Sequence, residues 1–221
     1  MTDCGAGAER PIGSSAGPSL WLQQEVQCLR NALREAIRTS PGSFLTTVED
    51  VDGKADDYWI GEIRSSTRVV AERDGAVVGI AAGKAPDGDK DPEDRSDSRY
   101  IESVWIAPGL RGNRLGKRLI TYLMAAELRK NPNIKQFLLW VFETNSSAIS
   151  LYKHMKFSDT QARQDGPDFR TEIKYRRDVN HETWAAIAET VDESVHAVVK
   201  QKHGVTYRVV GERDSTQSRF R

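Results

Sequence analysis

Apolar side chains recur every three or four positions in several stretches of the chain, the spacing that gives a helix one buried face. The first stretch begins after Ser19, a good N-cap, and stops before Ser40-Pro41-Gly42. In the second, Tyr58, Trp59 and Ile63 are expected to face inward. The pattern predicts helices over residues 20–38, 55–63, 115–130, 146–155 and 180–202.

Between these helices lie short runs of β-branched and aromatic residues, which are typical of strands. Arg73-Asp74-Gly75 separates two such runs and is a hairpin signal of the Asp-Gly kind. Residues 44–52 are mixed and then acidic, and no helix or strand is predicted there. We expect strands over residues 68–72, 76–82, 100–106, 136–142, 157–162, 169–176 and 205–210.

We expect the 221 residues to form three parts. Residues 1–18 are rich in Gly, Ala, Ser and Pro and have almost nothing to bury, so we expect a disordered leader. Residues 19–178 are expected to form one domain, and residues 179–221 a C-terminal extension packed on it. The apolar face of the helix in this extension suits packing on its own domain, formation of a homodimer or covering of an acceptor.

Charge and cysteine content exclude several classes of protein. Lys+Arg and Asp+Glu both number 32, and this balance argues against a general nucleic-acid or membrane-surface binder. Cys4 and Cys28 are too few for a disulfide framework, and neither they nor the histidines have metal-ligand spacing. No apolar run reaches membrane-spanning length. We therefore expect a soluble cytoplasmic protein with no metal and with neither nucleic acid nor membrane as a partner.

Residues 100–117, YIESVWIAPGLRGNRLGK, contain the clearest candidate site. A strand ends at Pro108-Gly109, and a loop with Gly112 and Gly116 leads directly into a helix. The first N–H groups of a helix lack internal partners, and glycine allows a phosphate to approach closely, so this order predicts an anion site. The loop lacks the Gly-Lys-Ser/Thr of a P-loop and the G-x-G-x-x-G of a dinucleotide site.

Two segments resemble motifs of a known family. Residues 101–120, IESVWIAPGLRGNRLGKRLI, resemble motif A of the GCN5-related N-acetyltransferases (the GNAT superfamily), and residues 137–157, FLLWVFETNSSAISLYKHMKF, resemble motif B. The resemblance covers roughly residues 69–175, although the family's commonest loop has glycine where this chain has Arg114. It implies the GNAT fold, a mixed α/β (α+β) architecture. Helices would flank a central, mostly antiparallel sheet with a splayed parallel pair in its middle.

The resemblance also implies acetyl-CoA as co-substrate, bound where the two strands of that pair separate. Pantetheine would pair with the backbone of Val104 and Ile106, and the pyrophosphate would lie on the amides from Gly112 to Lys117. Asn145 would hydrogen-bond the pantetheine arm. The alternative is that Asn145 is a plain helix N-cap, a role for which Thr144 is also a candidate. The implied donor-binding residues are Val104, Trp105, Ile106, Arg111, Gly112, Asn113, Arg114, Leu115, Gly116, Lys117, Asn145 and Tyr152.

Acetylation of an amine requires a neutral amine, a stabilised oxyanion and a proton for the departing thiolate. By the resemblance Tyr152 is the general acid, and a tyrosine that only packs against pantetheine is the alternative. Strand alternation places Glu102 on the same face as Val104 and Ile106 unless a bulge intervenes, which makes it the first candidate base.

Glu143 is the second candidate base, and either glutamate could instead bind a cationic acceptor. By the resemblance, Phe44 and Trp59 lie in a wall of the acceptor site, and the alternative is that both are core aromatics. The acceptor walls themselves are expected in residues 44–63 and 162–170.

The expected activity is that of an acetyl-CoA-dependent N-acetyltransferase. Its acceptor would be a primary amine of a small molecule, an amino-acid-like metabolite or a peptide. The alternatives are a protein N-terminal or lysine acetyltransferase and a non-catalytic acyl-CoA-binding sensor. An ATP-binding module is disfavoured because the phosphate loop has no Lys-Ser/Thr.

Overall fold

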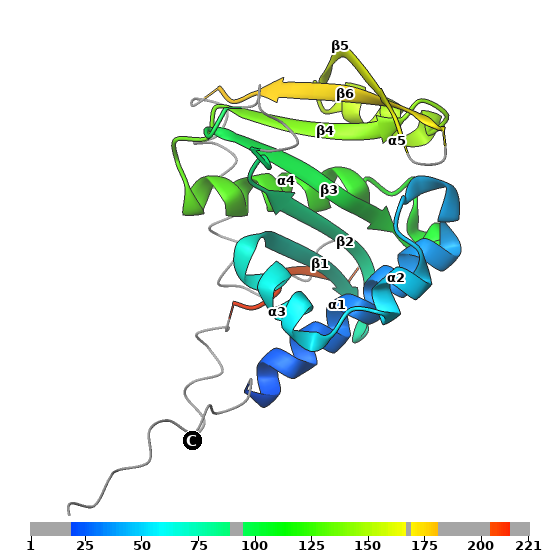
Figure 1. The fold of residues 1–221 in the computed structure, drawn as a ribbon, viewed down its shortest axis with the longest axis vertical. Helices are drawn as coiled ribbons and strands as arrows, with labels where there is room; N and C mark the ends of the chain where they lie inside the picture. Colours follow the sequence, from blue (N-terminus) through cyan, green and yellow to red (C-terminus); the bar gives the residue numbers. More distant parts are fainter. Residues whose placement is uncertain (1–18, 89–94, 167–168, 181–203, 213–221) are drawn as a thin grey trace, which may run out of the picture.

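The structure, a computed structural model, describes residues 19–88, 95–166, 169–180 and 204–212. Seven strands form one sheet in the order β5-β6-β4-β3-β2-β1-β7 (Figure 1). Their bounds are β1 (Thr67–Arg73), β2 (Ala76–Lys84), β3 (Ser98–Ile106), β4 (Gln136–Phe142), β5 (Ser158–Asp165), β6 (Thr171–Asp178) and β7 (Val205–Val209). Among the pairs formed by these strands, β3 and β4 are parallel and the others are antiparallel.

The parallel pair separates soon after it begins. Ser98, Arg99 and Tyr100 of β3 pair with Gln136, Phe137 and Leu138 of β4, and the recorded register ends there. Both strands continue, to Ile106 and Phe142. The expected mixed α/β fold, with a mostly antiparallel sheet and a splayed parallel pair, is confirmed.

Helices cover both faces of the sheet (Figure 1). The helices α4 (Leu115–Lys130) and α5 (Ser146–His154) bury their apolar side chains in one cluster with the sheet. The helices α1 (Leu20–Thr39), α2 (Val48–Asp52) and α3 (Asp56–Ser65) contribute to a second cluster on the other face. The short 3₁₀ segments η1 (Pro41–Ser43) and η2 (Pro108–Leu110) follow α1 and β3.

Most elements lie where the sequence predicts them. The exceptions occur near the N-terminus, where α2 forms in residues for which no helix was predicted. Thr47 and Asp50 cap each other's backbone amides there, a reciprocal capping box that does not depend on apolar periodicity. Tyr58 does not face inward as expected: it is 46% exposed, and its ring packs edge-on against the buried Trp59.

The C-terminal part of the described chain completes the edge of the sheet. β7 pairs antiparallel with β1 from Val205↔Arg73 to Val209↔Val69. Arg208 of this strand bonds Glu25 of α1 and Glu72 of β1. The leader predicted over residues 1–18 and nearly all of the helix predicted over residues 180–202 lie outside the described residues. No helix within the described part of the chain is long and apolar enough to span a membrane.

Two glycines predict substitution effects of opposite sign. A Cβ at Gly83 of β2 would lie 2.5 Å from Oε1 of Glu127, a buried carboxylate ion-paired with Arg99, whereas a Cβ at Gly61 of α3 meets no atom within 4 Å. We expect Gly83→Ala to lower the free energy of unfolding by about 1–3 kcal/mol because of overpacking. Gly61→Ala should raise it by roughly 0.5–1 kcal/mol through helix propensity. Urea unfolding of both variants checks this, and equal shifts would contradict the packing at Gly83.

Candidate active site

An extra residue interrupts β3 at the point where it leaves β4. Ala82 of β2 faces Glu102 and Ile80 faces Trp105, so two steps along β2 match three along β3. Ser103 lies in this insertion with φ of 54°, the left-handed region. This is the geometry of a β-bulge, which bends a strand and changes the side on which the following side chains lie.

The bulge decides the face on which Glu102 lies, which the sequence left dependent on whether a bulge is present. Val104 and Ile106 pack with the cluster beneath α4 and α5, whereas Trp105 packs with the cluster of α1. Glu102 follows Ile101, which belongs to the α4 cluster, so Glu102 lies on the opposite face from Val104 and Ile106. Alternation would place the three on one face only without a bulge. The extra residue is such a bulge and shifts the alternation by one position, so the three do not share a face.

The loop after β3 leads into a helix N-terminus, as the sequence predicts. Gly112 has φ of 81° and Arg114, the residue before α4, has φ of 61°. The first helical bond of α4 runs from the amide of Arg118 to the carbonyl of Arg114, so the amides of residues 115–117 precede any helical partner. A phosphate group placed here would meet these amides and the positive end of the helix dipole.

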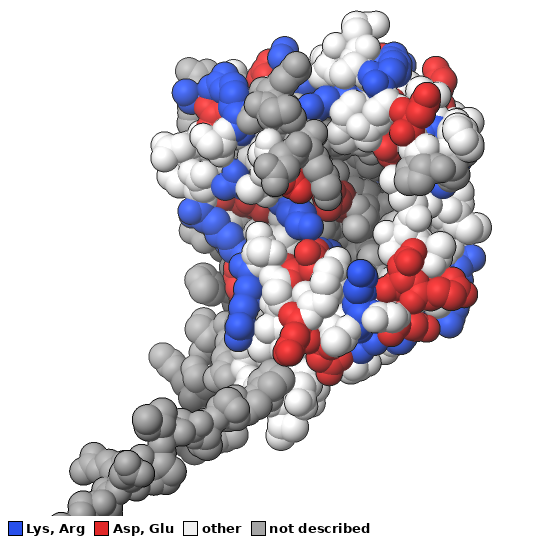
Figure 2. All heavy atoms as spheres, in the orientation of Figure 1, with Lys and Arg blue, Asp and Glu red and all other residues white. Residues whose placement is uncertain are grey.

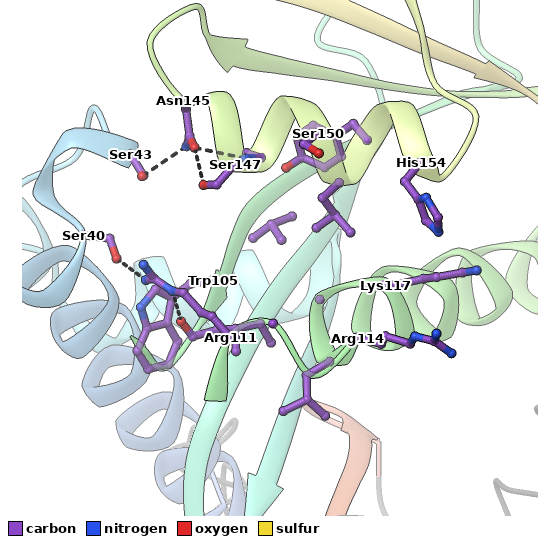
Figure 3. Close-up of a pocket in the computed structure, with 18 of the residues that line it drawn as sticks. Ser40, Ser43, Trp105, Arg111, Arg114, Lys117, Asn145, Ser147, Ser150 and His154 are labelled. Atoms are coloured by element: carbon purple, nitrogen blue, oxygen red, sulfur yellow. Dashed lines mark hydrogen bonds between the residues drawn. The ribbon is translucent and has the colours of Figure 1, made fainter. Parts of the chain in front are cut away.

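A cavity of about 600 Å³ lies between this helix start, α5 and the segment after α1 (Figure 3). Of the residues predicted for the site, Phe44, Val104, Trp105, Ile106, Arg111, Gly112, Arg114, Leu115, Gly116, Lys117, Asn145 and Tyr152 line it. Asn113, Glu102, Glu143 and Trp59 are not among its lining residues. Trp59 is 5% exposed within the α1 cluster, and that position favours the core alternative for this side chain.

Arg111 joins two walls of the cavity. Its Nε donates to the carbonyl oxygen of Ile106 at 2.9 Å, and one terminal nitrogen donates to Oγ of Ser40 at 2.6 Å. Figure 3 shows this side chain lying across from Arg114, which precedes α4, and Lys117 in its first turn. The guanidinium therefore fixes the end of β3 to the segment after α1.

Asn145 holds the start of α5. Its Oδ1 accepts from the amide of Ala148 at 3.2 Å and from Oγ of Ser147 at 3.1 Å, which confirms the predicted N-cap. Its Nδ2 donates to Oγ of Ser43 at 3.2 Å (Figure 3). Asn145 thus connects α5 to the same segment that Arg111 contacts.

These features, a splayed parallel pair, a bulge and a helix N-terminus beside a cavity, can be compared with known proteins. The acetyltransferase (GNAT) family model matches residues 30–157, more than half of the chain. The chain belongs to the GNAT family. The family resemblance of the two sequence motifs is thereby confirmed.

Individual relatives are more distant. A mouse (Mus musculus) thialysine N-epsilon-acetyltransferase is 30% identical over 80 residues, which are 36% of this chain and 46% of the relative. The chain thus spans about half the length of the curated relatives it matches.

Solved structures show the same fold. A ribosomal-protein-alanine N-acetyltransferase from Brucella melitensis matches with a TM-score of 0.54 and 20% identity, over 71% of this chain and 96% of that one. A ribosomal L7/L12 alpha-N-protein acetyltransferase in complex with coenzyme A matches with a TM-score of 0.53 and 13% identity, over 71% and 90%.

Within this GNAT site, Tyr152 is buried but reaches the cavity. The residue is 6% exposed, and its ring packs edge-on against Phe157 with centroids 5.9 Å apart. Burial raises the pKa of the Tyr152 phenol. The group is therefore a neutral O–H donor across the physiological range. Glu102 and Glu143 are exposed.

The structure adds cavity residues that were not predicted from the sequence. They are Ser40, Ser43, Ser147, Ala148, Ser150, Leu151 and His154. Part of this set had a readable signal: Ser147, Leu151 and His154 are spaced at four and seven positions, which places them on one side of a helix. Ser40 and Ser43 had no such signal, because they come from a segment far away in the sequence.

The left-handed backbone at Arg114 predicts a difference between two substitutions. Arg114→Gly and Arg114→Ala remove the same charge, but only glycine adopts φ near +60° without steric strain. We expect the glycine variant to be the more stable of the two by about 1 kcal/mol. Thermal unfolding measures the difference, and calorimetric titration with acetyl-CoA should give similar affinities for both variants. An alanine variant as stable as the glycine variant would show that this position is not strained.

Proposed function

We propose that this GNAT enzyme transfers an acetyl group from acetyl-CoA to a primary amine. The amine would belong to a small molecule, an amino-acid-like metabolite or a peptide, and it would attack the thioester directly in a ternary complex. The observation that carries the proposal is the separation of β3 from β4, which opens onto a cavity beside the N-terminus of α4.

The donor site follows from this separation. One edge of β3 pairs with β2 along most of its length, while the edge toward β4 is paired only from Ser98 to Tyr100. Backbone groups farther along that edge are placed to pair with an extended pantetheine arm, as an added strand would. The pyrophosphate would then lie on the amides of residues 112–117, with Lys117 and Arg114 adding charge. Arg111 supports this site through the Ile106 carbonyl.

The chemistry needs little covalent help from the protein. The neutral amine attacks the thioester carbonyl, the tetrahedral intermediate collapses, and the C–S bond breaks with release of the thiolate of CoA. The Tyr152 phenol donates its proton to this thiolate and regains one from solvent. The proton lost by the amine passes to water. Glu102, on the opposite face of β3 from Val104, is the proposed base that accepts this proton through the water.

Charge around the site is consistent with an amine acceptor. Figure 2 shows a hollow between the upper strands and α2, with acidic side chains gathered over α2. The acidic residues of this helix are Glu49, Asp50 and Asp52. A negative rim attracts protonated amines and increases their local concentration. Two amines are suitable first probes. One is thialysine, the lysine analogue in the name of the curated relatives, and the other is a peptide beginning with alanine, chosen from the name of the ribosomal-protein neighbour.

A ligand-stability measurement tests the donor assignment. Acetyl-CoA at a hundred times its dissociation constant should stabilise the fold by about 2.7 kcal/mol, which raises the melting temperature by roughly 5–10 °C. Magnesium–ATP serves as the control and should give no comparable rise. Thiol release from acetyl-CoA should then increase on addition of thialysine or the alanine peptide. Binding of acetyl-CoA without release by any amine would instead support the non-catalytic sensor.

Substitution of Tyr152 separates catalysis from binding. Tyr152→Phe removes the proton donor but keeps the ring, so we expect kcat to fall by about a hundredfold while the acetyl-CoA melting shift is retained. Tyr58→Phe, at an exposed tyrosine outside the cavity, is the matched control. Because its pKa is raised, Tyr152 should cause no alkaline loss of kcat below about pH 10. Unchanged kcat in Tyr152→Phe would leave this residue only a packing role.

A further inference from the structure

Residues 40–44, which we call the strap, connect α1 to α2 and form one wall of the cavity. Ser40, Ser43 and Phe44 line the cavity, while Pro41 and Gly42 are exposed. The 3₁₀ turn within the strap contains no buried residue. Phe44 is partly buried and packs against the α1 cluster, but the other residues of the strap bury little apolar surface. Side-chain hydrogen bonds from other elements therefore contribute to holding the strap in place.

Three side chains of the described residues make such bonds. Arg111 donates to Oγ of Ser40 and Asn145 donates to Oγ of Ser43 (Figure 3). The third is Arg170, which donates to two backbone carbonyls of the strap, that of Gly42 at 2.7 Å and that of Phe44 at 3.2 Å. Arg170 therefore binds the strap backbone on both sides of Ser43.

The guanidinium of Arg170 is itself held in place. Its central carbon lies 3.9 Å from the centroid of the Phe142 ring, which is 4% exposed at the end of β4. Stacking on an aromatic ring uses the face of the guanidinium, and its in-plane N–H groups donate to acceptors in the same plane. The end of β4, the connection from β5 to β6 and the strap are thus joined through one side chain.

Two segments, residues 44–63 and 162–170, are expected to build the acceptor walls. Arg170 belongs to the second segment and bonds Phe44 at the start of the first. Phe44 is the strap residue that both lines the cavity and offers its carbonyl to Arg170, so this bond contributes to its position together with its packing on the α1 cluster. We propose that Arg170 is a positioning residue for the amine acceptor, which it serves by holding the strap, and with it Phe44, against the end of β4. The proposal rests on the proposed function, since it assigns a wall of the same site.

The test compares Arg170→Ala and Arg170→Lys with Arg176→Ala. Lysine keeps the charge but has neither the fork nor the flat stacking surface, so it should restore little. Arg176 lies on the neighbouring strand β6 and pairs with Asp178 at an exposed position, so its loss controls for removal of a surface arginine. Hydrogen exchange of the amides of residues 42–45 reports on the strap without any acceptor. Calorimetric titration gives the acetyl-CoA affinity, and steady-state kinetics gives the KM for thialysine.

In Arg170→Ala we expect the strap amides to exchange about tenfold faster, as loss of hydrogen bonds to a charged donor allows. The KM for thialysine should rise about tenfold, because the wall must then be ordered on binding, while the acetyl-CoA affinity changes by less than about threefold. The melting temperature and the exchange of β4 should match those of Arg176→Ala.

Unchanged exchange of residues 42–45 would overturn the proposal, whatever the activity. So would an equal loss of acetyl-CoA and thialysine affinity, which would make the strap a donor wall. A lower melting temperature with unchanged KM values would leave Arg170 only a structural role. If the wild-type protein releases no thiol with thialysine or with the alanine peptide, the proposed function fails, and the exchange comparison still decides whether Arg170 holds the strap.

Discussion

The site depends on the early separation of β3 from β4. A parallel pair that stayed together would satisfy its own backbone groups and leave no edge for a ligand. Here pairing covers only Ser98–Tyr100, and the bulge at Ser103 follows within three residues. Since each strand is followed by a helix, at Leu115 and at Ser146, the opening between the strands also brings two helix N-termini to one cavity. The unpaired edge of β3, and with it the proposed donor site, follows from this divergence.

Polar contacts hold the paired end of β3 and β4, where the two strands begin. These contacts stabilise the sheet although the strands diverge farther along. Nε2 of Gln136 donates to Oγ of the fully buried Ser98 at 2.7 Å. Beside it, Arg99 pairs with Glu127 of α4, and both side chains are largely buried. A buried ion pair of this kind is costly to break because it leaves an uncompensated charge. The two strands are therefore held together at one end, and toward the other end each is paired, among the described strands, only with its other neighbour, β2 or β6.

The sequence was sufficient for features that local physics controls. The strand over residues 136–142, the helix over residues 115–130 and the cap at Asn145 all follow from periodicity and capping chemistry, and the structure confirms them. The bulge could not be predicted, because Ser103 is neither glycine nor proline and its left-handed backbone depends on pairing with β2. The contacts of the strap could not be predicted from the sequence either, because they join residues far apart in the chain. Arg111 and Ser40 are 71 positions apart, and Asn145 and Ser43 are 102 apart.

These distant contacts change how the cationic side chains of the phosphate loop should be understood. Arg111 is among the donor-binding residues that the resemblance implies, but its guanidinium is occupied by the Ile106 carbonyl and by Ser40. In the proposed site, the pyrophosphate would then be held by the backbone amides at the start of α4, which need no particular side chain, and by Arg114 and Lys117. Arg111 serves geometry instead. By joining the end of β3 to the strap, it links the proposed donor edge to the proposed acceptor wall. The distance between these two walls is therefore set by contacts within the protein and not by either ligand.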